Sequence, residues 1–312
     1  MLGTIMHETS GRWQFGLFLS LTTATLWGLL PIALKGLLQY TDSLTITWFR
    51  FAIAAVTLGG YLAYRGKLPK LTLLSQKHLL ILISIVVAGL LGNYILYMYG
   101  LELTTPGGAQ VMIQTAPMLL LIGGLVLFKE QFHFKQWLGL ITFCIGLILF
   151  FNQRFEQFLN AEGNYSYGIF LVFIAGVLWA AYALAQKQLL KWFKSDQIMI
   201  VVYIMGSLVF LPNSNVMVIE QFDTLAWGLL IFCGANTLVA YGAFAEALDH
   251  WEASRVSATL AITPLLTLIF MQITESVIPG YVVAEPINGI SIFGAILVVA
   301  GSAVTALSKS SK

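Results

Sequence analysis

The chain has 312 residues, of which 58% are hydrophobic and 10% are charged, and its net charge is +2. A soluble domain carries about 25% charged residues, so this composition excludes a water-soluble globular protein. The small net charge also gives no reason to expect nucleic acid as a partner. We therefore expect an all-α polytopic membrane protein whose surroundings are a lipid bilayer.

Ten apolar runs are candidates to cross about 30 Å of hydrocarbon as helices. The seventh is the weakest because it stops early and polar residues follow it closely, so nine spans remain an alternative. In chain order the runs are 15–35, 43–64, 78–100, 105–128, 134–151, 167–187, 197–211, 225–246, 253–275 and 288–307.

The basic residues predict the orientation of these runs. If ten runs cross and the N-terminus is cytoplasmic, all of the 16 Lys and Arg residues except Lys35, Arg50 and Arg154 fall on the cytoplasmic side. Membrane proteins concentrate Lys and Arg in cytoplasmic loops. Without a crossing at 197–211 this bias would disappear in the second half, so the distribution favours ten spans with both termini cytoplasmic.

The chain contains an internal repeat at an offset of about 147 residues, because 92–131 returns as 239–275. Such duplicated halves are typical of secondary transporters. A similar match relates 26–35 to 178–187. The matched residues include Tyr94 with Tyr241, Pro117 with Pro264, Trp27 with Trp179 and Lys35 with Lys187.

The repeat predicts the domain organisation. The first half covers 1–151, an exterior linker covers 152–165, and the second half covers 166–312. Each half would hold five helices, and an odd number forces the second half into the membrane upside down relative to the first. We therefore predict ten transmembrane helices in two inverted five-helix repeats.

Two prolines lie near the middle of matching spans, Pro117 in the fourth and Pro264 in the ninth. A proline inside a helix cannot donate to the carbonyl four residues back, so the carbonyls of Ile113 and Leu260 should be released. One interpretation is a broken helix at a substrate site. The alternative is a simple kink whose carbonyls are satisfied by neighbouring threonines such as Thr115, Thr259 and Thr263.

Several polar side chains lie inside the apolar runs, where they need partners or a wet cavity. Gln110 and Gln114 are four residues apart and share one helical face. The alternative to a cavity is hydrogen bonding between packed helices, which we favour for Ser and Thr. Other polar residues of this kind are Asn93, Tyr94, Tyr97, Tyr182, Gln186, Asn236, Thr237, Tyr241, Ser257, Thr259 and Thr263.

Arg50 is the basic residue that lies well inside a span. Three interpretations are open: its side chain extends to the exterior surface, it pairs with an exterior carboxylate such as Glu102, or it binds an anionic group of a substrate. We favour the first two over the third. The acidic residues fall at span ends, so the sequence gives no support for proton coupling.

Motifs of enzymes and metal sites are missing from the sequence: it has no HExxH, P-loop or GxSxG. The histidines lie in the N-terminal tail or near span ends, and Cys144 and Cys233 lie in apolar runs. We therefore expect no catalytic activity, no cofactor and no metal site.

The chain resembles the EamA-like members of the drug/metabolite transporter superfamily. The resemblance rests on the two halves of five spans, LWG in the first span, WFRF in the second, the mid-helix prolines, and the glutamate in LVLFKEQF. The two halves depart from strict symmetry in two ways. Glu275 lies two residues nearer to Pro264 than Glu130 lies to Pro117, and the seventh span has no arginine that corresponds to Arg50.

This resemblance implies a central cavity and the export or exchange of amino acids or other small metabolites across a bacterial inner membrane. Arg50, Pro117 and Pro264 would have gating or structural roles. The implied substrate-binding positions are Trp27, Asn93, Tyr97, Gln110, Gln114, Trp179, Tyr182, Asn236, Tyr241 and Thr263.

The sequence thus predicts a carrier of a small-molecule substrate. The alternative is a membrane-embedded binding or regulatory protein that has the transporter fold without net flux. An intramembrane enzyme is the third and weakest reading. A monomer and a homodimer are equally compatible with the sequence.

Overall fold

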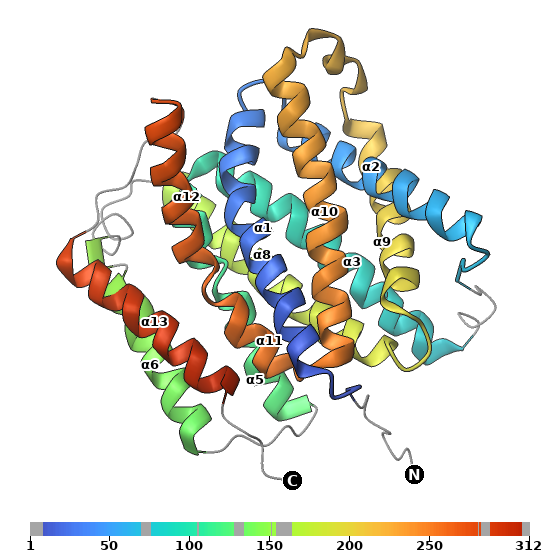
Figure 1. Ribbon diagram of the computed structural model, residues 1–312. Helices are drawn as coiled ribbons and strands as arrows, with labels where there is room; N and C mark the ends of the chain where they lie inside the picture. Colours follow the sequence, from blue (N-terminus) through green and yellow to red (C-terminus); the bar gives the residue numbers. More distant parts are fainter. Residues whose placement is uncertain are drawn as a thin grey trace.

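The computed structural model describes residues 9–69, 76–104, 106–127, 134–150, 152–153, 164–279, 281 and 288–307 (Figure 1). Within these ranges the chain is helical and contains no β-strand. The helices are α1 (Trp13–Leu37), α2 (Ser43–Tyr64), α3 (Lys77–Leu103), α4 (Pro106–Met112), α5 (Thr115–Leu127), α6 (Phe134–Phe150), α8 (Asn164–Leu189), α9 (Ser195–Phe210), η2 (Leu211–Asn213), η3 (Val216–Gln221), α10 (Thr224–His250), α11 (Ala253–Leu260), α12 (Thr263–Val277) and α13 (Gly289–Leu307).

Among the described residues, seven helical segments are long and apolar enough to cross a membrane: Trp13–Leu37, Ser43–Tyr64, Lys77–Leu103, Ser166–Leu189, Ser195–Asn213, Thr224–His250 and Ala253–Val277. Large apolar side chains also face outward, for example Val56 and Phe134, which are 76% and 75% exposed. An outer surface of this kind is suited to lipid. The prediction of an all-helical, polytopic membrane protein is confirmed.

The weakest predicted run, 197–211, is helical from Ser195 to Phe210, and η2 extends it to Asn213. It is among the seven segments long enough to span a membrane. The early end of its apolar sequence is therefore compensated by a 3₁₀ extension. The predicted runs 105–128, 134–151 and 288–307 contain α4 with α5, α6 and α13 respectively.

The long helices pack in pairs in which the two members come from different halves of the chain. α3 packs along α8, α1 along α10, α2 along α9 and α6 along α13, with α6 and α13 on the opposite side of the bundle from α2 and α9 (Figure 1). Glycines allow these close approaches. A Cβ atom at Gly100 of α3 would lie 2.4 Å from Val172 Cγ2 of α8, and one at Gly301 of α13 would lie 2.5 Å from the carbonyl oxygen of Gly139.

Two of the predicted spans are broken rather than kinked. α4 ends at Met112 and α5 begins at Thr115, while α11 ends at Leu260 and α12 begins at Thr263. The breaks precede Pro117 and Pro264 because neither proline can donate to the carbonyl four residues back. The predicted release of the Ile113 and Leu260 carbonyls from regular helical bonding agrees with these positions.

Both released carbonyls nevertheless have donors. The Leu260 oxygen accepts a hydrogen bond from the Thr263 hydroxyl at 2.6 Å, as the alternative interpretation expected. The Ile113 oxygen accepts from the backbone N–H of Ala116 at 2.9 Å. The Thr115 hydroxyl donates instead to Met112 O at 2.9 Å. The breaks are thus stabilised locally, in a different way in each half.

Candidate functional site

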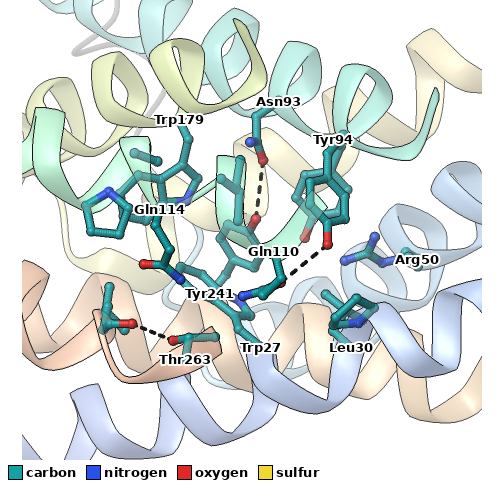
Figure 2. A pocket seen from close by; sticks show the side chains of 16 residues that line it. Trp27, Leu30, Arg50, Asn93, Tyr94, Gln110, Gln114, Trp179, Tyr241 and Thr263 are labelled. Atoms are coloured by element: carbon teal, nitrogen blue, oxygen red, sulfur yellow. Dashed lines mark hydrogen bonds between the residues drawn. The ribbon is translucent and has the colours of Figure 1, made fainter. Parts of the chain in front are cut away.

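A cavity of about 80 Å³ is lined by residues of α1, α2, α3, α4, α5, α8, α10, α11 and α12 (Figure 2). Asn93, Trp27, Trp179 and Tyr241, which line it, fall in the middle third of their long helices. A buried water needs roughly 10–15 Å³ on this measure, so the cavity has room for a compact molecule equivalent to several waters. The place of the cavity at mid-length of the helices is the one expected of a transporter site.

Eight of the ten predicted binding positions line this cavity, together with Arg50 and Pro117. The eight are Trp27, Asn93, Tyr97, Gln110, Gln114, Trp179, Tyr241 and Thr263. Seven of them come from α1, α3, α4, α8, α10 and α12, and Gln114 lies in the break between α4 and α5, so both halves of the chain contribute. The structure brings these side chains together; their contact with a substrate remains a prediction.

Aromatic rings form one wall of the cavity. The rings of Trp27 and Trp179 meet edge to face, with centroids 5.6 Å apart, and Trp27 lies 5.0 Å from Tyr241. Phe244 packs behind them, 4.9 Å from Trp179. Such rings offer flat apolar surface and polarised edges. The indole Nε1 of Trp27 is buried and has no hydrogen-bond partner.

Three amides point toward the cavity, and they differ in how well they are satisfied (Figure 2). Asn93 Nδ2 donates to the Ala175 carbonyl of α8 at 3.0 Å, so this side chain also joins two helices. Gln110 Oε1 has a long contact of 3.5 Å with the Tyr97 hydroxyl. Gln114 is 3% exposed, and its Oε1 has no partner. A buried acceptor without a donor is a position that a ligand can satisfy.

Arg50 lies at the cavity wall and is 2% exposed. Its Nε donates to the Thr237 hydroxyl at 2.9 Å, and its Cζ lies 4.3 Å from the centroid of the Tyr94 ring. Of the three interpretations, extension to the exterior surface is wrong because the side chain is buried. Pairing with Glu102 is not seen either: the Glu102 carboxylate accepts from the Ser43 hydroxyl at 2.7 Å.

Two predicted positions, Tyr182 and Asn236, lie outside the cavity lining. Tyr182 is fully buried behind the wall, and its hydroxyl contacts Met199 Sδ at 3.5 Å. Asn236 donates to the Leu26 carbonyl at 2.6 Å and so joins α10 to α1. Both face neighbouring helices because their own helices turn those sides away from the cavity. Pro264 is buried next to the lining residue Thr263 but is not part of the lining.

Tyr94 is the most informative lining residue absent from the predicted positions. Its ring lies between those of Tyr241 and Phe51, at 5.2 and 4.6 Å, and under the guanidinium of Arg50. The repeat contains the missing signal, because Tyr94 matches Tyr241. The other unpredicted lining residues are apolar: Leu30, Pro31, Ile113, Ala116 and Leu260.

Away from the cavity, Glu246, Asp249 and His250 bring possible metal ligands within 4.8 Å of one another. Both nitrogens of the His250 ring are already in contact, Nε2 with Glu246 at 3.4 Å and Nδ1 with the Ser10 hydroxyl at 2.6 Å. The Ser195 hydroxyl also donates to Glu246. These contacts describe a network that ties the start of the chain and α9 to the end of α10, rather than an open metal site.

Known proteins match this chain over both of its halves. The model of the EamA-like transporter family matches residues 14–152 and again 166–307. An uncharacterized transporter of Haemophilus influenzae is 38% identical over 292 residues, covering 94% of both chains. The uncharacterized inner membrane transporter YhbE of Escherichia coli is 36% identical over 292 residues, covering 94% of this chain and 91% of its own.

A protein of known crystal structure has the same fold, with a TM-score of 0.69 at 16% identity, over 94% of this chain and 97% of its own. The fold, the mid-length cavity and the two family matches, one in each half of the chain, lead to one conclusion. The chain belongs to the EamA-like transporter family.

Proposed function

We propose that the chain is a secondary transporter that exports or exchanges a small metabolite, an amino acid or a related compound, across a bacterial inner membrane by alternating access. The observation that carries the proposal is the cavity at mid-length of the bundle, where buried polar atoms of Trp27 and Gln114 lack partners. Transporter sites lie at this depth, where helices are broken. Membership of the family supports the same function.

The proposal includes ten spans in two inverted five-helix halves, 1–151 and 166–312, joined by 152–165 on the exterior, with both termini cytoplasmic. Exchanging the halves turns the α3–α8 pair into the α10–α1 pair, and it turns α2–α9 and α6–α13 into themselves. Repeat-matched residues also meet at the cavity, Trp27 with Trp179 and Tyr94 with Tyr241. Contacts of this kind are expected where a pseudo-two-fold axis passes through the site.

The broken helices supply places where the halves can move. α11 and α5 pack against each other, and the Ser257 hydroxyl donates to the Pro117 carbonyl across that contact. At the end predicted to be cytoplasmic, the Ser195–Glu246–His250–Ser10 network holds α9, α10 and the N-terminal segment together. In the proposed cycle this network opens when the cavity becomes accessible from the cytoplasm.

The test is counterflow of labelled metabolites into sealed proteoliposomes preloaded with the same unlabelled compounds. We expect saturable accumulation that empty liposomes lack. Gln114→Ala should weaken the apparent affinity about 3- to 10-fold, since one hydrogen bond is lost. The matched control is Gln272→Ala, which removes an exposed glutamine of α12 and should leave transport unchanged.

Saturable binding without accumulation in this assay would favour the binding or regulatory alternative. Accumulation that is unaffected by Gln114→Ala would move the site away from this cavity.

A further inference from the structure

The cavity contains a buried cation, Arg50, that has no counter-ion among the described residues. Among the described residues, no Asp or Glu lines the cavity; Arg50 donates a hydrogen bond to the Thr237 hydroxyl, and its guanidinium lies over the ring of Tyr94. We propose that the cavity selects a compact organic monoanion whose carboxylate binds to Arg50. This inference rests on the proposed transport function and narrows its substrate from amino acids and related metabolites to compact monocarboxylates without an ammonium group.

The guanidinium of Arg50 has more N–H donors than the one that Thr237 engages. Arginine carries five N–H groups in a planar fork that matches a carboxylate in two parallel hydrogen bonds. The Nε of Arg50 is used by Thr237, whose own hydroxyl donates to the Cys233 carbonyl at 2.9 Å. The Tyr94 ring lies against the guanidinium and stabilises the cation. Because Nε is engaged by Thr237, the N–H groups of the two Nη atoms are the ones that an incoming oxyanion would meet.

The charge of the bound complex distinguishes the ligand classes. A charge buried at low dielectric is unfavourable unless it is paired. A monoanion beside Arg50 makes the loaded cavity neutral. A zwitterionic amino acid would leave its ammonium group without a carboxylate partner, and a dianion would leave one negative charge. A neutral ligand would leave Arg50 as it is. Among these four classes, only the monoanion balances the charge.

The other lining residues indicate the shape and polarity of the part of the ligand that lies beyond its carboxylate. Trp27, Trp179 and Tyr241 present flat aromatic surface, which suits a planar or apolar body. The free Nε1 of Trp27 is a donor and the free Oε1 of Gln114 is an acceptor, so one ligand group of each complementary kind would be satisfied. The cavity of about 80 Å³ limits the ligand to a small molecule.

The test compares aromatic probes of different charge, of which benzoate and benzamide are matched in shape: benzoate, benzamide, phenylalanine and phthalate. Equilibrium binding of each labelled probe is measured on the full chain in detergent, and flux of the same probes is measured in proteoliposomes. We expect benzoate to bind about tenfold or more tightly than benzamide, because a hydrogen bond to a charged group is the stronger kind. Phenylalanine and phthalate should also bind more weakly than benzoate.

The variants separate charge from fold. Arg50→Gln should abolish the preference for benzoate over benzamide, and Arg50→Lys should retain part of it, since lysine keeps the charge but lacks the fork. Thr237→Val should weaken benzoate binding by loosening Arg50. The matched control is Arg65→Gln, which removes an exposed arginine that also lies over a tyrosine, Tyr61, at 5.6 Å. It should keep the full preference.

The results also distinguish this proposal from the transport function. If benzamide or phenylalanine binds as tightly as benzoate, or if Arg50→Gln keeps the preference, the anion site is wrong. Flux of a neutral or zwitterionic compound without benzoate binding would overturn the anion site and leave transport standing. Benzoate binding without flux of any probe would support the anion site and contradict transport.

Discussion

Tyr94 and Tyr241, which match each other in the internal repeat, face each other across the bundle with ring centroids 5.2 Å apart. Tyr94 also carries the guanidinium of Arg50 over its ring at 4.3 Å. One side chain thus connects the duplicated halves of the chain to the cation of the cavity.

The Arg50–Tyr94 contact should be measurable as a coupling free energy. In a double-mutant cycle with Arg50→Gln and Tyr94→Leu, we expect a coupling of about 1–2 kcal/mol in thermal unfolding, because the pair is desolvated. The same cycle on the exposed pair Arg65 and Tyr61 should give a smaller value. Equal couplings for the two pairs would mean that burial adds nothing to the Arg50 contact.

The helix breaks before Pro117 and Pro264 should serve transport rather than stability. Replacing either proline by alanine allows a continuous helix, and an interior proline disfavours a helix by ~3 kcal/mol, so unfolding should become no easier. Transport should nevertheless fall, by roughly tenfold if the break shapes the site. Pro212→Ala in η2, away from the cavity, is the control. Normal flux in both Pro117→Ala and Pro264→Ala would show that the breaks have no role in transport.

Close packing of α3 on α8 should make Gly100 intolerant of any side chain. A Cβ atom there would lie 2.4 Å from Val172 Cγ2 and 2.8 Å from the Gly168 carbonyl oxygen. Gly100→Ala should therefore destabilise the protein by about 1–3 kcal/mol through overpacking. A Cβ atom added at Gly60 of α2 would have no atom within 4 Å, so Gly60→Ala should leave stability unchanged or raise it. Thermal unfolding in detergent measures both, and equal melting temperatures would contradict the packing.

The crossing of α9 can be tested directly by topology reporters. Fusions that end at Lys194 and at Ser214, on either side of α9, should report the cytoplasm and the exterior respectively. The expectation follows from the preference of Lys and Arg for cytoplasmic loops. Reports from the same side would remove one span and with it the inverted symmetry of the two halves.

Much of the architecture could be predicted from the sequence because lipid imposes simple requirements. The apolar runs had to become helices, since backbone groups in hydrocarbon must bond within their own segment. The breaks at Met112–Thr115 and Leu260–Thr263 follow because Pro117 and Pro264 cannot donate a hydrogen bond to the carbonyl four residues earlier. Polar side chains deep in those runs indicated a cavity, and most of them line one.

What the sequence left open is the rotation of each helix about its own axis. These helices are apolar on all sides, so periodicity does not mark the side that faces the cavity. Tyr182 and Asn236 were therefore predicted as binding positions and Tyr94 was not, yet the tertiary structure turns the first two toward neighbouring helices and Tyr94 into the cavity. The partner of Arg50 was undetermined for the same reason. Only the packing of α2 against α10 brings Thr237 to its guanidinium and keeps carboxylates of the described residues away from it.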